Sequence, residues 1–135
     1  MSAESAIVAG RVAAVRLMVD WFTAYAPGPP VTGADGMESP SWIPKGRTKG
    51  KVRGNSLISH DTSERAVVVG LVQRSILDGS LHIPLTAPVP AIGWEYVCTA
   101  VGPTTDPAMK GTRWHVVNVP IETFATARRL EVVRL

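Results

Sequence analysis

The chain has 135 residues, of which 45% are hydrophobic and 19% charged, and its formal net charge is +3. This length corresponds to one domain, 1–135, and the hydrophobic fraction excludes an intrinsically disordered chain. Cys98 is the single cysteine, which excludes a disulfide framework and favours a reducing compartment.

Residues 1–20 predict an N-terminal helix. Apolar residues recur there at the spacing of one helix face: Val8, Val12, Val15 and Val19. Ser2 or Ser5 is expected to cap the helix. Arg11 and Arg16 interrupt the apolar stretch, which argues against a signal peptide, and no apolar run approaches the ~20 residues that cross a bilayer. We therefore expect an intracellular protein without a membrane partner.

Residues 21–135 predict a series of short strands. In the first strand, Trp21, Thr23 and Tyr25 are expected on one face, and "PGPP" at 27–30 is expected to end it. A long loop is predicted at about 27–50, because this stretch is rich in Gly, Pro, Ser and Asp. Loops of this length in small domains usually have a function.

The remaining strands follow at close spacing. "RTKGKVRG" predicts a strand that exposes its charges, and the β-branched run "RAVVVGLVQRSI" also favours strands. Asp78 and Gly79 predict a turn. Further strands are predicted at "WEYVCTAV", "TRWHVVNV" and "RRLEVVRL". One helix followed by six or seven strands, without crossover helices, predicts a mainly β fold: a small antiparallel β-barrel or sandwich with long loops.

Catalytic, cofactor-binding and metal-binding patterns are absent from the sequence. His60, His82 and His115 have no partner at metal-ligand spacing, and no serine lies in a nucleophile elbow. His60 beside Asp61 suits an oriented base, but a polar connection explains the pair equally well. His82 and His115 are expected on strand faces, His115 without a catalytic partner. We predict that the protein is not an enzyme and that it has no cofactor.

Five basic residues form the strongest candidate for a binding site. They fall within nine residues with no acid among them: Lys45, Arg47, Lys49, Lys51 and Arg53. A solvated loop is one interpretation, and contact with DNA phosphates is the other. Five phosphate contacts give a slope of roughly −4.5 in log affinity against log salt. No aromatic residue is interleaved in the run for base stacking, so the predicted contact is electrostatic and independent of base sequence.

The order of several short motifs resembles a family of small proteins from the morphogenesis modules of actinobacterial siphophages. The opening stretch matches at Gly10, Arg11, Arg16, Leu17, Met18, Asp20, Pro27 and Gly28. "PKGRTKGKVR" resembles the second strand of that family, and "LHIPLTAPVPAIGWEYVCTA" resembles its Pro-centred strand and turn. The stretch 106–133 resembles its closing hairpin, with Asp106 and Gly111 in the turn. The chain departs from the family at Trp94, where an Asp is frequent.

Such proteins are head–tail connector components, and the nearest role is the stopper, or head-closure protein. The resemblance implies a homo-oligomeric ring, hexameric or dodecameric, that docks below the portal and adaptor and faces a tail-terminator or tail-tube protein. It implies non-specific contact with packaged double-stranded DNA at the head–tail junction of a virion made in the bacterial cytoplasm. The basic run is then expected to face the DNA or the lumen.

Three other functions are compatible with the sequence. The first is an adaptor or tail-terminator component of the same head–tail connector, although adaptors tend to be helical. The second is a free-standing nucleic-acid-binding protein with an OB-like barrel, which predicts aromatic side chains that stack on the bases. The third alternative is a small hydrolase that uses His60 and Asp61.

Overall fold

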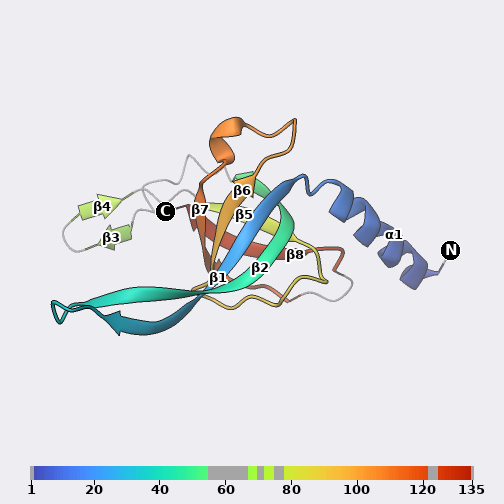
Figure 1. Cartoon of the computed structure of the whole chain (residues 1–135). Coiled ribbons are helices and arrows are strands. Elements are labelled where there is room, and N and C mark those ends of the chain that lie inside the picture. Colours follow the sequence, from blue (N-terminus) through green and yellow to red (C-terminus); the bar gives the residue numbers. More distant parts are fainter. Residues whose placement is uncertain (1, 55–66, 70–71, 75–77, 122–124, 135) are drawn as a thin grey trace.

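A computed structural model describes residues 2–54, 67–69, 72–74, 78–121 and 125–134. These residues form an N-terminal helix and a barrel of antiparallel strands, which confirms the predicted mainly β fold (Figure 1). The elements in chain order are α1 (Ala3–Arg16), β1 (Asp20–Thr32), β2 (Glu38–Gly54), β3 (Val67–Val69), β4 (Val72–Arg74), β5 (Asp78–Ile83), β6 (Glu95–Ala100), the 3-10 turn η2 (Pro107–Met109), β7 (Arg113–Asn118) and β8 (Arg128–Arg134).

Six strands close the barrel in the order β1-β2-β5-β8-β7-β6, and β6 pairs with β1. Every pair of neighbours is antiparallel. The strands β3 and β4 pair with each other in a separate two-stranded sheet. Among the described residues, each of these six strands pairs with a neighbour on both sides, as in other closed barrels.

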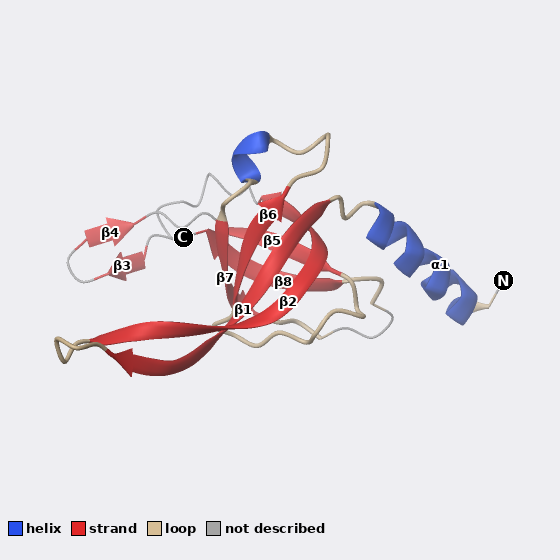
Figure 2. Cartoon of the chain, in the orientation of Figure 1, coloured by secondary structure: helices blue, strands red, loops and turns tan. Residues whose placement is uncertain are grey.

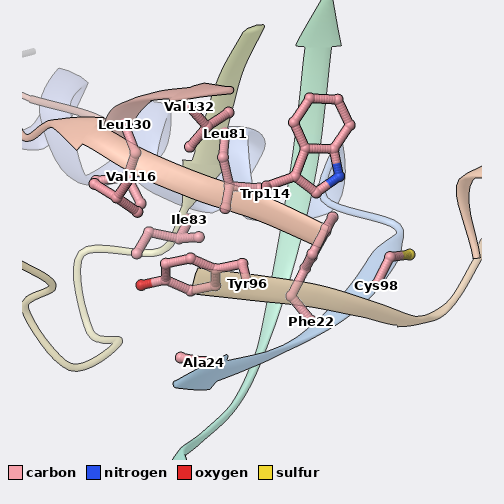
Figure 3. Close-up of a cluster of buried hydrophobic side chains, with 10 residues drawn as sticks. All are labelled: Phe22, Ala24, Leu81, Ile83, Tyr96, Cys98, Trp114, Val116, Leu130 and Val132. Carbon is pink, nitrogen blue, oxygen red and sulfur yellow. The ribbon is translucent and has the colours of Figure 1, made fainter. Parts of the chain in front are cut away.

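Alternation along the strands places the hydrophobic core inside the barrel. In β1, Phe22 and Ala24 are buried, whereas Trp21, Thr23 and Tyr25 share the outward face, as predicted. The core cluster comprises Phe22, Ala24, Leu81, Ile83, Tyr96, Cys98, Trp114, Val116, Leu130 and Val132 (Figure 3). Cys98 is a buried, free thiol of this core, as expected. Burial raises the pKa of this thiol, which keeps it protonated.

The predicted loop at about 27–50 is wrong, because most of this stretch is a long hairpin. The strand β1 continues past the prolines to Thr32 and pairs with β2 down to Thr32 opposite Glu38. Figure 2 shows this two-stranded extension, residues 27–44, projecting from one end of the barrel; we call it the arm. Pairing of β1 with β6 stops at Tyr25, and pairing of β2 with β5 begins at Lys51. Prolines are tolerated there because no third described strand requires their missing N–H groups.

The helix α1 confirms the predicted N-terminal helix but ends at Arg16. Ser2 caps it, since its side chain accepts a hydrogen bond from the Ser5 N–H at 3.1 Å. The helix contacts the segment before β8: Arg11 Nε donates to the Ala125 carbonyl at 3.2 Å. None of its residues is buried. α1 and the arm lie on opposite sides of the barrel (Figure 1).

Two predicted turns have different outcomes. Asp78 and Gly79 begin β5 instead of forming a turn, because Gly79 pairs with Gly54 on one side and with Val132 on the other. In the closing stretch, the Asp106 carboxylate accepts from the Ala108 N–H at 2.9 Å and caps η2. Gly111 adopts φ 88°, a conformation that favours glycine, so both residues serve a turn as predicted. This turn connects β6 to β7 and precedes the closing pair of β7 and β8, instead of lying within it.

Candidate nucleic-acid interface

The five basic residues lie on one strand, β2. Its outward face carries Arg47, Lys49, Lys51 and Arg53, whereas Lys45 is exposed at the β-bulge opposite the step from Ala24 to Tyr25. Thr48 and Gly50 between them are buried toward the core, so the alternating cations point away from it. The register places Arg47 opposite Thr23, Lys49 opposite Trp21, and Lys51 opposite His82. This arrangement confirms that the segment exposes its charges from a strand. We call Lys45, Arg47, Lys49, Lys51 and Arg53 the basic row.

An aromatic side chain lies beneath two members of the basic row. The Arg47 guanidinium carbon is 4.5 Å from the Trp21 ring centroid, and Lys49 Nζ is 5.5 Å from it. Lys45 Nζ lies 6.0 Å from the ring of Trp94. Such cation–π contacts orient the charged groups over a rigid surface. The sequence motif lacked an aromatic residue because Trp21 comes from the neighbouring strand.

The positive surface extends from β2 across the next two strands. Lys51 is opposite His82 on β5, and His82 is opposite Arg129 on β8. His82 is half-buried between these strands. Its pKa is lowered by burial and by the charges of Arg129, Lys51 and Arg53. At neutral pH this histidine is therefore neutral, and it has the strand-face position predicted for it.

Acidic groups do not neutralise this surface within the described part of the chain. The ion pairs between described residues both involve Glu95, which lies 2.9 Å from Arg113 Nη1 and 4.0 Å from His115 Nδ1. No pair joins a member of the basic row to a described carboxylate. The row therefore presents net positive charge to solvent.

Glu95 is a neighbour of His115 that the sequence spacing does not reveal. The two residues face each other across β6 and β7. Glu95 is buried, and its carboxylate accepts a hydrogen bond from Arg113. A separation of 4.0 Å is too long for a hydrogen bond between His115 and Glu95. The position of Arg113 and His115 beside Glu95 is explained by charge pairing with a buried carboxylate. Among the described contacts, no nucleophile or second acid lies next to Glu95.

The described residues provide no support for a catalytic site, a metal-binding site or a membrane-spanning helix. His60 and Asp61 lie outside the described residues. Within the described ranges, no three His, Cys, Asp or Glu side chains gather in an arrangement able to hold a metal ion. No helix in these ranges is long and apolar enough to cross a membrane. The basic row and its extension over β5 and β8 thus form the candidate interface.

Comparison with known proteins identifies the family and the fold. The chain belongs to a family described as a family of unknown function, DUF6093, whose model matches residues 10–133. The chain is similar to the solution structure of protein SF1141 from Shigella flexneri 2a, a structural-genomics target, with a TM-score of 0.53 and 14% sequence identity. That similarity covers 87% of this chain and 91% of the other, and it concerns the fold alone. No curated protein matches the chain.

Proposed function

We propose that this member of a family of unknown function is a structural component of a phage head-to-tail connector, in the role of the stopper or head-closure ring. It assembles as a hexameric or dodecameric ring at the head–tail junction, below the portal and adaptor. Its other face contacts the tail-terminator or tail-tube protein. The basic row contacts packaged double-stranded DNA without reading its base sequence. No bond chemistry and no cofactor are involved.

The basic row is the observation that carries this proposal. Four cations on one face of a strand, with a fifth at its β-bulge, suit a phosphate backbone better than a compact ligand, because they extend along the strand. Each copy supplies a small patch, and repetition around a ring multiplies its effect. A closed barrel provides a stiff support for that patch.

The projecting parts of the chain support assembly into a ring. The arm and α1 lie on opposite sides of the barrel, so each subunit has extensions toward two different neighbours (Figure 1). Val8 and Val12 on α1 are 58% and 50% exposed, and Met37 at the arm tip is 69% exposed. Contacts between two different surfaces of identical subunits generate a ring when the rotation between neighbours closes. The mainly β fold also favours a stopper over a helical adaptor.

The free-standing nucleic-acid binder is the weaker alternative. Binding of single strands usually requires exposed aromatic faces on which bases stack. The Trp21 ring is covered by Arg47 and Lys49 instead. Contacts through the cations to a duplex backbone are therefore favoured over stacking of bases.

Charge reversal within the basic row tests the proposal. We expect the variant Lys49→Glu/Lys51→Glu to assemble into connectors while the particles lose packaged DNA. The matched control is Lys110→Glu/Arg134→Glu, which changes the charge equally at exposed positions outside the row. Negative-stain microscopy measures assembly, and nuclease protection measures retained DNA. Normal DNA retention in the row variant, with normal assembly, would contradict the proposed DNA contact.

A further inference from the structure

Beyond the basic row, a pocket of about 210 Å³ opens where the C-terminal end of α1 meets the outside of the barrel. Its lining includes Lys51, Arg53, His82 and Arg129, which come from three adjacent strands. The lining also includes Ala14 of α1, Leu17 directly after α1, and Thr126 before β8. The lining contains no Asp or Glu.

The strand register forces these basic groups together. Lys51, His82 and Arg129 are direct cross-strand neighbours in one line, and side chains in such positions have Cβ atoms roughly 4.5–5.5 Å apart. Arg53 lies two residues along β2 from Lys51 on the same face. Lys51 and Arg129 flank the neutral His82 from its two neighbouring strands, and Arg53 lines the same pocket, so three like charges converge there. A bound anion offsets the repulsion between these cations, whereas the empty pocket retains it.

We propose that this pocket is a binding site for one phosphate group, held by Lys51, Arg53 and Arg129 with His82 as a fourth, protonation-dependent donor. The phosphate belongs either to the backbone of duplex DNA or to a free phosphorylated molecule. The DNA source rests on the proposed function, while the phosphate chemistry does not. Thr126 contributes a hydroxyl-bearing side chain to the lining, and Ala14 and Leu17 form the apolar side of the pocket.

The charges that face His82 favour an anion. Lys51 and Arg53 on β2 and Arg129 on β8 are the cations. Among the residues that the structure describes, Glu131, two residues along β8 from Arg129, is the nearest outward-facing acid in the register. The end of α1 contributes a partial negative charge of about half a unit. Three full positive charges outweigh that dipole, so the net field in the pocket attracts a phosphate.

His82 makes the binding dependent on pH. Its pKa in the free protein is lowered by burial and by the three cations. A dianion in the pocket cancels part of that repulsion and raises the pKa again. By linkage, the affinity for the anion then increases as the pH falls through the range in which His82 takes up its proton.

Sulfate is the first probe, because it remains a dianion across this pH range and does not itself titrate. The chemical shifts of the His82 imidazole are followed by NMR from pH 8 to pH 5, with and without sulfate, at constant ionic strength set by sodium chloride. We expect sulfate to raise the His82 pKa and to bind about tenfold more tightly at the acidic end. Unchanged His82 shifts in excess sulfate would overturn the proposal.

Three variants separate a binding site from a general charge effect. Arg129→Gln should abolish the response to sulfate, and Lys110→Gln, an exposed charge elsewhere, should leave it intact. If Arg129→Gln does not fold, His82→Gln keeps all three cations. That variant should bind sulfate with an affinity independent of pH. Persistence of the pH dependence in His82→Gln would contradict the role given to His82.

A blunt-ended DNA duplex of about 20 base pairs then identifies the source of the phosphate. Perturbation of His82 by both sulfate and the duplex supports the pocket as a DNA contact. Perturbation by sulfate alone, with no duplex binding, keeps the phosphate site and counts against the DNA contact of the proposed function. Duplex binding that leaves His82 unchanged overturns the pocket but leaves the basic row as the DNA contact.

Discussion

Arg47 lies over the ring of Trp21, with its guanidinium carbon 4.5 Å from the ring centroid. The two residues are 26 positions apart in the sequence and occupy adjacent strands of the hairpin. The contact orients a long, flexible cation on the outside of the barrel and thereby reduces the entropy it loses on binding a phosphate. Trp21 on β1 thereby supports the DNA contact that we propose for the basic residues of β2.

Removal of the aromatic support should therefore weaken duplex binding. We expect Trp21→Ala to reduce the affinity for duplex DNA about 2- to 5-fold, since exposed cation–π contacts contribute about 0.5–1 kcal/mol. Trp21→Phe should retain most of the affinity. Fluorescence anisotropy with a labelled duplex at fixed salt measures both. Equal losses in the two variants would argue against support by the aromatic face.

The slope of duplex affinity against salt concentration should report how many phosphates the basic row contacts. With all five cations engaged, log affinity should fall with a slope of roughly −4.5 against log salt. Lys49→Gln/Lys51→Gln should make that slope shallower by about 2. Anisotropy titrations between 50 and 200 mM salt provide the measurement. An unchanged slope in the double variant would place the duplex elsewhere on the protein.

Asp20 should be among the most important polar residues for stability. It is buried, and its carboxylate accepts hydrogen bonds from the Gly102 N–H at 2.8 Å and from the Thr105 hydroxyl at 2.6 Å. Asp20→Ala leaves both donors without their partner, so we expect a loss of about 1–3 kcal/mol in the free energy of unfolding. The control Asp35→Ala, in the exposed turn of the arm, should cost less than about 0.5 kcal/mol. Urea denaturation followed by tryptophan fluorescence distinguishes these outcomes.

The stability of the isolated protein should fall as His82 takes up a proton. The folded state lowers the His82 pKa, so the unfolded chain binds the proton more readily. Stability contributed by neutral His82 is thus present above the ordinary histidine pKa of about 6.5 and declines below it. His82→Gln should flatten the profile of unfolding free energy between pH 7 and pH 5. A profile of the variant that matches the original chain would exclude His82 as the titrating group.

The prolines of the arm should prevent strands of different molecules from pairing. Pro40 and Pro44 lie in the part of β2 that pairs only with β1 among the described strands. Pro40→Thr/Pro44→Thr supplies N–H donors and β-branched side chains to this edge, which favours pairing with another chain. We expect self-association of the variant in sedimentation velocity at concentrations where the original chain does not associate further. Pro88→Thr, in an exposed loop, is the control.

Periodicity was sufficient to predict the helix, most strands of the barrel wall and the exposed cations of β2, but the start of β5 at Asp78 and Gly79 was predicted as a turn. Alternation is a local property, so Phe22 and Ala24 could be assigned to one face and Trp21 to the other from their spacing. The arm was missed because prolines at 27, 29 and 30 usually end a strand, and they are tolerated only where no third strand lies alongside. Whether a third strand lies beside the prolines depends on the strand order of the complete sheet, which the local sequence does not specify.

The composition of the candidate site could not be predicted, because it depends on the strand order. His82 and Arg129 join Lys51 only because β5 pairs with β2 and β8 pairs with β5. The segments between these strands do not specify that order. The lowered His82 pKa and the pocket beside α1 both follow from this register, so sequence spacing gave no signal for either.

Cryo-electron microscopy of intact virions that encode this chain tests the connector assignment most directly. The proposal predicts a ring of these barrels between the adaptor and the tail, with the basic row facing the DNA channel. A ring at that position with the basic row turned away from the channel would contradict the DNA contact. Absence of the protein from the particle would contradict the connector role itself.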